Sequence, residues 1–269
     1  MVDVDVIEGG SSRIVNTGVL TVEGFESTGV FFQPFGTVFE NSGEINVTGR
    51  NSHAVETLFN SGFDITNSGA ITVTGNNANA FTIGTSAFGI SHELTTVTNT
   101  GSITLSGGSN NAFELATSSQ GVRDIEVTNS GDISIDGVTS FGVTGFFSGN
   151  YTIVNDGTID ITGDSSGGIT GFSGTNPDDG TPALGVITNS GSITVTGEFA
   201  EGISINNATG LTLSNSGEVT VSGDRSVGVS TRDGVNQSIT NSSMIAATGL
   251  ESVGVELFRD EGSIITNDG

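Results

Sequence analysis

The sequence predicts an all-β protein folded as a right-handed parallel β-helix, a solenoid with three short strands in each coil of about 26 residues. Three observations predict this fold class. A unit that opens with Asn recurs along the chain, apolar and polar residues alternate on both sides of that Asn, and a Gly follows it at a fixed distance. We expect roughly nine to ten coils and a rod of roughly 45 Å, at roughly 4.8 Å per coil.

The repeat unit is clearest in NSGSITVTG, which starts at Asn189. Nine complete units and a truncated tenth, NDG, start 25, 26, 32, 30, 26, 34, 26, 26 and 26 residues apart. At a tight corner Asn tolerates unusual backbone dihedrals, and its amide can donate to one neighbouring coil and accept from the other. We therefore predict a structural ladder of side chains at one corner. Its members are Asn16, Asn41, Asn67, Asn99, Asn129, Asn155, Asn189, Asn215, Asn241 and Asn267.

The strands follow from the residues around each Asn. Those four and six positions after it are apolar, as in Ile193 and Val195, and this alternation is typical of a half-buried strand. A Gly eight positions after the Asn, such as Gly197, indicates a corner that a residue without Cβ turns easily.

A second strand begins at a Gly or Ala thirteen positions after the Asn, which is always followed by an apolar residue, as in Gly202 and Ile203. The short apolar run before the next Asn forms the third strand. Crossovers between parallel strands are nearly always right-handed, which predicts the hand of the coil.

Length variation is expected at one corner only. The register is constant from each Asn to about sixteen residues beyond, so the longer units carry extra residues between the second and third strands, at 84–96, 116–126 and 172–186. Loops on one edge of a solenoid often carry its binding function, although tolerance of insertions explains these lengths as well. The candidate binding residues in them are Phe88, His92, Glu93, Arg123, Asp124, Asp178 and Asp179.

Composition excludes several classes of function. The repeat makes residues 1–269 a single solenoid domain with 30 acidic residues, six basic residues and a net charge of −24, which disfavours binding to nucleic acid or to anionic lipid surfaces. With no Cys, there is no disulfide and no Cys-based zinc site. The start MVDVDVIEGG does not read as a signal peptide and no stretch reaches transmembrane length, so we expect no direct membrane insertion by this segment. Calcium repeats of the G-G-x-G-x-D type are absent, and we expect no metal and no cofactor.

Few residues suit catalysis. The chain has no Cys and no Lys, and its two histidines lie in different units, so a nucleophilic triad is not expected. The best carboxylate set is Asp132, Asp136 and Asp160, on outward positions of adjacent coils. A separation of roughly 8 Å between Asp136 and Asp160 would suit an inverting glycosidase, and right-handed β-helices include polysaccharide lyases and hydrolases. The long loops lie at the corner opposite this face and would not wall a cleft there. We therefore expect no enzyme, with a polysaccharide-active one as the alternative.

The positions five and seven after each Asn give a further alternative. Pairs such as Thr72 with Thr74 and Thr194 with Thr196 resemble the T-x-T faces of ice-binding solenoids, although Thr is also favoured on exposed strands. The residues that interrupt these two columns are Glu23, Asn46, Asp136, Asp160 and Ala246.

The units NSGSITVTG, NSGEVTVSG and NTGSITLSG, with S-x-G-V segments such as SVGV at 226–229, resemble the passenger β-helices of autotransporter and filamentous-haemagglutinin-like proteins. The resemblance implies a secreted or surface-exposed bacterial rod that acts as an adhesin, a biofilm matrix protein or a stalk, displayed by an outer-membrane barrel outside this chain. The implied partners are glycans or proteins of a host surface or matrix.

The chain begins within a coil and stops three residues into a repeat. We therefore expect it to be a segment of a longer protein. The alternative is a filament subunit whose exposed strand edges stack head to tail.

Overall fold

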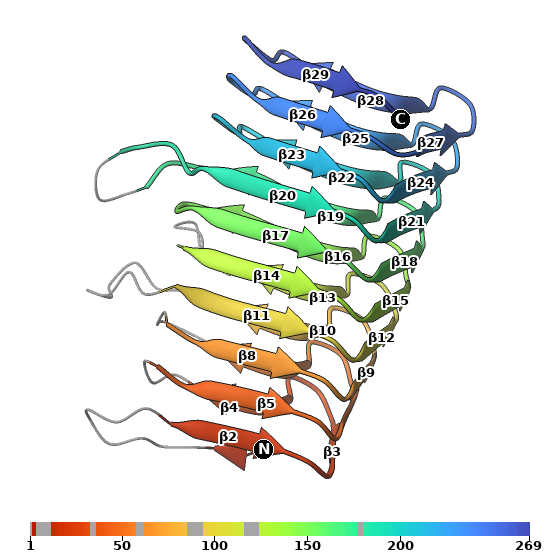
Figure 1. The fold of residues 1–269 in the computed structure, drawn as a ribbon. Helices are drawn as coiled ribbons and strands as arrows, with labels where there is room; N and C mark the ends of the chain where they lie inside the picture. Colours follow the sequence, from red (N-terminus) through yellow and green to blue (C-terminus); the bar gives the residue numbers. More distant parts are fainter. Residues whose placement is uncertain are drawn as a thin grey trace.

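A computed structural model describes residues 2–3, 12–32, 36–57, 62–84, 94–115, 124–176 and 180–269, with only the backbone of residues 2–3. These residues form a parallel β-solenoid of about nine turns with about 26 residues per turn, and none of them is helical (Figure 1). Every strand in the three sheets pairs in parallel with its equivalent one coil away. The fold class predicted from the repeat is confirmed.

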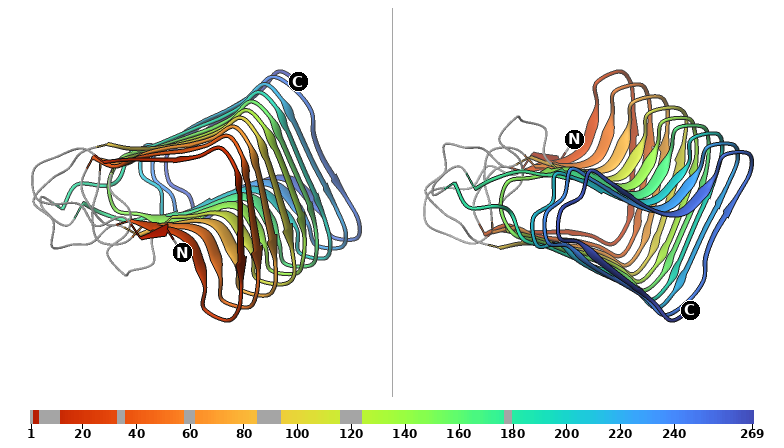
Figure 2. Two further views of the ribbon diagram at one scale, coloured as in Figure 1. Left: turned by 90° about the horizontal axis from the view of Figure 1, so that it is seen from below. Right: turned by 90° about the horizontal axis from the view of Figure 1, so that it is seen from above.

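We name the three sheets A, B and C, and their strands are given in the next paragraphs. In each turn the chain runs through sheet B, then sheet C, then sheet A. In Figure 1 the sheet B strands cross the front from left to right, and the chain returns behind through sheet A while it climbs toward the C-terminus. Figure 2 shows the same course from below and above: sheets A and B face each other and sheet C closes the wide end. The coil is therefore right-handed, as the crossover rule predicts.

In sheet C, β27 starts four residues after its repeat Asn, and the other eight strands start three residues after theirs. Most of these strands alternate between outward polar and inward apolar side chains. In β15, for example, Ile133 and Ile135 are buried while Asp132, Ser134 and Asp136 are exposed. The strands of sheet C are β3 (Val19–Glu23), β6 (Glu44–Thr48), β9 (Ala70–Thr74), β12 (Ser102–Ser106), β15 (Asp132–Asp136), β18 (Thr158–Thr162), β21 (Ser192–Thr196), β24 (Glu218–Ser222) and β27 (Ile245–Thr248).

Sheet A follows the Gly corner. At this corner a Cβ on Gly163, whose φ is +157°, would lie 2.0 Å from the carbonyl oxygen of Gly137 in the adjacent coil, so stacking requires Gly. The strands of sheet A are β1 (Val2–Asp3), β4 (Thr28–Phe32), β7 (His53–Thr57), β10 (Asn79–Ile83), β13 (Asn111–Leu115), β16 (Phe141–Phe147), β19 (Gly167–Ser173), β22 (Glu201–Asn206), β25 (Val227–Arg232) and β28 (Val253–Phe258).

Sheet B ends each turn at the next repeat Asn. Its strands are β2 (Arg13–Asn16), β5 (Val38–Asn41), β8 (Asp64–Asn67), β11 (Thr95–Asn99), β14 (Ile125–Asn129), β17 (Tyr151–Asn155), β20 (Gly185–Asn189), β23 (Thr212–Asn215), β26 (Ser238–Asn241) and β29 (Ile264–Asn267).

The repeat asparagines form the predicted ladder. Each Nδ2 donates to the Oδ1 of the next Asn along the axis, over distances such as 2.7 Å from Asn67 to Asn99 and 2.8 Å from Asn129 to Asn155. From Asn41 to Asn241 these side chains are at most 3 % exposed. The ladder therefore satisfies a row of buried amides that would otherwise destabilise the fold.

The expected unusual dihedrals lie elsewhere in the repeat. None of the described ladder asparagines has a positive φ. Instead, the residue ten positions after each Asn is left-handed, with φ between 51° and 60°, and this turns its N–H toward a carbonyl of the next coil, as from Phe199 to Asp224. The residues at this left-handed position are Glu26, Asn51, Asn77, Ser109, Thr139, Ser165, Phe199, Arg225 and Glu251.

Aromatic rings pack within the apolar core. Phe81 and Phe113 stack with ring centroids 5.3 Å apart, and Phe147 stacks on Tyr151 at 4.1 Å. The Tyr151 hydroxyl forms a 2.7 Å hydrogen bond with Ser173. Within the described residues the core is thus a continuous apolar column with few polar groups. Four buried side-chain atoms in this part of the chain have no hydrogen-bond partner: Thr57 Oγ1, Asn111 Oδ1, Ser148 Oγ and Gln237 Oε1.

Candidate functional site

The carboxylates predicted on sheet C lie on one exposed, flat face. Register places Asp160 beside Ser134 and Asp136 beside Thr162, so Asp136 and Asp160 are one coil and two residues apart. Asp132 accepts a 2.6 Å hydrogen bond from the Thr158 hydroxyl. Within the described ranges, no group of His, Asp and Glu side chains could hold a metal ion.

The hydroxyl columns of sheet C also face outward as expected. Two short contacts cross between coils, from Ser106 to Thr74 at 3.4 Å and from Ser222 to Thr196 at 3.1 Å. The acidic side chains of Asp136 and Asp160 stand in the same two columns. The columns therefore form a mixed acidic and hydroxyl surface rather than an unbroken Thr array.

Each long unit carries its extra residues between a strand of sheet A and the following strand of sheet B, namely between β10 and β11, β13 and β14, and β19 and β20. Six of the seven candidate loop residues lie outside the described residues: Phe88, His92, Glu93, Arg123, Asp178 and Asp179. The seventh, Asp124, has a φ of 44°, and its Oδ1 accepts a 3.2 Å hydrogen bond from the N–H of Asn150. That contact gives Asp124 a structural role within the corner.

A polar network that the sequence did not reveal lies on the outer side of sheet A. We call His53, Glu56, Asn79, Thr82 and Glu114 the acidic seam. Asn79 Nδ2 donates to Glu114 Oε2 over 2.6 Å and to the Thr82 hydroxyl over 3.1 Å, while Thr82 Oγ1 lies 3.0 Å from His53 Nδ1. These contacts link four side chains from three coils.

Burial sets the protonation of the acidic seam. It raises the pKa of Glu114, against hydrogen bonds from Thr82 and Asn79, and the nearby Glu56 raises it further. Burial lowers the pKa of His53, while Glu56 opposes that change. Although His53 and Thr82 resemble a base and a nucleophile, Thr82 is only 2 % exposed and cannot meet a dissolved substrate. The seam is therefore a structural network with unusual titration.

A second buried carboxyl on sheet A behaves similarly. Burial raises the pKa of Glu201, opposed by a hydrogen bond with Ser204 and by the charge of Arg232. Ser204 in turn accepts a 2.9 Å hydrogen bond from Ser230 in the next coil.

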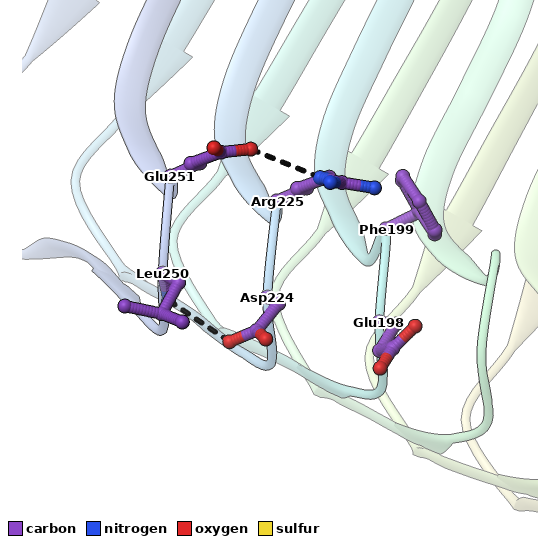
Figure 3. Close-up of a pocket in the computed structure, with 6 residues that line it drawn as sticks. All are labelled: Glu198, Phe199, Asp224, Arg225, Leu250 and Glu251. Carbon is purple, nitrogen blue, oxygen red and sulfur yellow. Dashed lines mark hydrogen bonds and ion pairs between the residues drawn. The ribbon is translucent and has the colours of Figure 1, made fainter.

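A hollow of about 220 Å³ lies at the corner between sheets C and A, across three adjacent coils. We call it the corner hollow. Two rows of side chains line it, one from the ninth and one from the tenth position after the repeat Asn (Figure 3). Its lining residues are Glu198, Phe199, Asp224, Arg225, Leu250 and Glu251.

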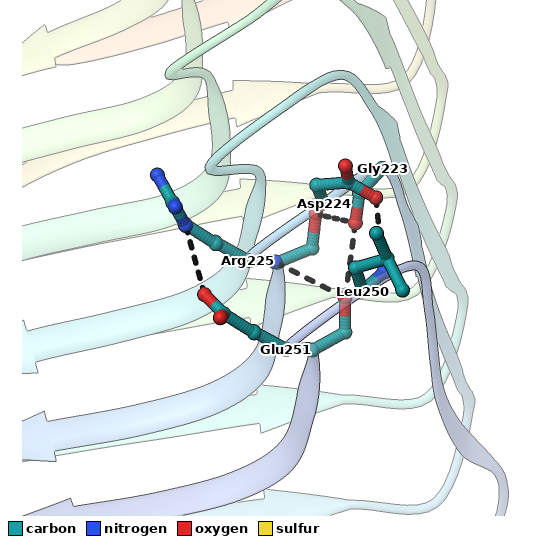
Figure 4. Close-up of polar contacts among 7 residues, drawn as sticks. Gly223, Asp224, Arg225, Leu250 and Glu251 are labelled. Carbon is teal, nitrogen blue, oxygen red and sulfur yellow. Dashed lines mark hydrogen bonds and ion pairs between the residues drawn. The ribbon is translucent and has the colours of Figure 1, made fainter.

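Hydrogen bonds between coils position both rows of the corner hollow. The Leu250 N–H donates to Asp224 Oδ1 over 2.9 Å, and the Arg225 N–H donates to the Leu250 carbonyl over 2.8 Å (Figure 4). The Arg225 side chain bridges the second row: its Nε donates to Glu251 over 3.0 Å, and its guanidinium carbon lies 5.4 Å from the centre of the Phe199 ring. Phe199 is nevertheless 46 % exposed, and Leu250 is 73 % exposed.

Comparisons with protein-family models, curated proteins and solved structures found no match to this chain. In the part of the chain that the structure describes, no helix is long and apolar enough to cross a membrane.

Proposed function

We propose that this chain is a structural and adhesive β-solenoid that works outside a bacterial cell as a surface-displayed passenger, a stalk or a segment of matrix or adhesin. The observation that carries the proposal is the constancy of the coil. Three sheets and a buried Asn ladder repeat along the described solenoid, while strands β10 and β11, β13 and β14, and β19 and β20 are joined by longer connections on one edge. A rigid scaffold with variable connections on one edge suits display.

We propose a non-catalytic role. Asp132, Asp136 and Asp160 lie on a flat exposed face, and the His53 and Thr82 pair is shielded by its neighbours. An extracellular location and a glycan or protein ligand are supported by the resemblance of the repeat units to bacterial passenger β-helices. The strongly acidic surface suits a rod that must stay soluble.

The test is adhesion without turnover. Beads coated with the chain are applied to panels of immobilised glycans and matrix proteins, with beads that carry an unrelated acidic protein of similar net charge as the control. We expect retention on specific surfaces, with no new reducing ends and no unsaturated products released from the glycans. Release of such products would refute the non-catalytic role, and retention no better than the control would refute adhesion.

A further inference from the structure

The corner hollow has an excess of negative charge. Three carboxylates and one guanidinium line it, and the guanidinium of Arg225 already pairs with Glu251. Among the described residues, no ion pair involves Glu198 or Asp224. These two carboxylates leave about two units of negative charge at the mouth of the hollow for a cation from outside.

Apolar side chains complete the lining of the corner hollow. Phe199 and Leu250 stand in adjacent rows, and both remain exposed although most large apolar residues of this chain are buried. Phe199 also holds a left-handed backbone, with φ 57°, which is uncommon for a bulky residue. A site with carboxylates beside exposed apolar carbons suits a ligand with a cationic end and an apolar stem.

The other coils do not repeat this combination. The residues at the ninth position of the earlier coils are Phe25, Arg50, Asn76, Gly108, Val138 and Asp164. Carboxylates occupy the ninth position in three successive coils, at Asp164, Glu198 and Asp224, and the hollow lies where the last two meet Phe199, the one aromatic residue at the tenth position.

We propose that the corner hollow is a docking point for an arginine side chain of a protein partner. The guanidinium lies between Glu198 and Asp224, where it matches the forked geometry of carboxylates, and its methylene stem covers Leu250 and the free edge of Phe199. The net charge of −24 favours approach of a basic surface and opposes a second copy of this chain. This inference rests on the proposed function, because it names a partner class for an adhesive rod.

The test is a titration with the blocked peptide acetyl-Gly-Arg-Gly-amide, followed through the backbone amide resonances of the whole chain. The matched peptide with citrulline is neutral but nearly the same shape, and the peptide with lysine has the charge without the fork. We expect the largest shifts at the amides of the hollow, which are those of Phe199, Asp224, Arg225 and Leu250. The citrulline peptide should bind at least tenfold more weakly than the arginine peptide, and high salt should weaken binding of the arginine peptide. Equal binding of arginine and citrulline would overturn the proposal.

Variants separate the hollow from general acidity. Asp224→Asn keeps an acceptor for the Leu250 N–H, and Glu198→Gln preserves side-chain size, so thermal unfolding should change little. Each should weaken arginine-peptide binding at least threefold, whereas Asp132→Asn, which removes the same charge from sheet C, should change it less than twofold. Equal weakening by Asp132→Asn would show diffuse charge attraction and overturn the proposal.

The two proposals fail differently. If the beads do not adhere better than the control but the arginine peptide still binds and Asp224→Asn weakens that binding, the adhesive role alone is refuted. Adhesion that survives Asp224→Asn and Glu198→Gln, together with peptide shifts spread over all acidic faces, refutes the corner hollow alone.

Discussion

Replacing Asn129 with Ala removes one rung from the middle of the ladder. In the intact chain Asn129 Nδ2 donates to Asn155 Oδ1 over 2.8 Å, and Asn129 Oδ1 accepts from Asn99 Nδ2 over the same distance. The variant leaves both neighbours in place but without this partner, and both are at most 1 % exposed. The damage is therefore two buried polar groups that water does not reach.

The magnitude follows from those two groups. An orphaned buried donor or acceptor costs about 1–3 kcal/mol, which gives about 2–6 kcal/mol for the pair. Asn99 Nδ2 keeps a 3.3 Å contact with the Gly101 carbonyl, so we expect the lower part of that range, about 2–4 kcal/mol. The matched control is Ser222→Ala, which breaks the exposed 3.1 Å contact with Thr196 and should cost less than about 0.5 kcal/mol.

The assay is urea unfolding followed by circular dichroism, combined with amide hydrogen exchange. In a stacked repeat each coil depends mainly on its neighbours, so faster exchange should concentrate in the coils that contain Asn99, Asn129 and Asn155. Asn129→Asp gives a second measurement, because its carboxylate would face the acceptor of Asn155 and should destabilise more at pH 7 than at pH 4. If Asn129→Ala costs no more than Ser222→Ala, the ladder does not stabilise the solenoid.

Three further outcomes follow from the packing. Glu114→Gln should raise stability in thermal unfolding at pH 7 but not at pH 4. Because burial raises the pKa of Glu114 in the folded chain, this carboxyl stabilises the fold below its ordinary pKa, and that contribution is lost as the pH rises. A smaller gain at pH 7 than at pH 4 would contradict this sign. Tyr151 is the single tyrosine, and burial raises its pKa to about 12. Absorbance of the folded chain should therefore show one phenol that titrates near pH 12, and stability should be lost between pH 10 and 12. Titration near pH 10 in the folded chain would refute the burial of Tyr151. Gly163→Ala should lower the free energy of unfolding in urea by at least about 2 kcal/mol, because the new Cβ would clash with the Gly137 carbonyl oxygen. The control is Gly180→Ala, at φ +71° with open space around it, which should cost about 1 kcal/mol. Equal costs would exclude the stacking clash as the cause.

Periodicity was sufficient for the scaffold because a solenoid stacks identical positions. A constant spacing places each Asn, Gly and apolar residue beside its equivalent, and the observed pairing of Asn99 with Asn129 and Ile103 with Ile133 follows directly. The left-handed residue at the tenth position escaped notice because its identity varies from Asn to Phe and Arg, and only the backbone conformation is shared.

The acidic seam escaped notice because sheet A breaks the period of two. His53 and Glu56 are three residues apart, so a regular strand would place them on opposite faces. Strand pairing in β7 and β10 passes from His53 to Val55 and omits Ala54, and both Ala54 and Val55 turn inward. Because two consecutive residues, Ala54 and Val55, both turn inward, His53 and Glu56 lie on the same outer side of the sheet. Strict alternation along the sequence would have placed His53 and Glu56 on opposite sides.

Stability and recognition use different positions of the same coil. A ladder position such as Asn129 contacts its equivalents through side chains on both sides, so a substitution there disturbs two neighbouring coils. At the corner hollow the stacking contact that recurs from coil to coil is made by the backbone, as between the Arg225 N–H and the Leu250 carbonyl, so the side chains there can vary. Glu198 and Phe199 can therefore differ from the equivalent residues of other coils without loss of the fold. A solenoid of this kind can acquire a binding site at its outer corner while the Asn ladder stays unchanged.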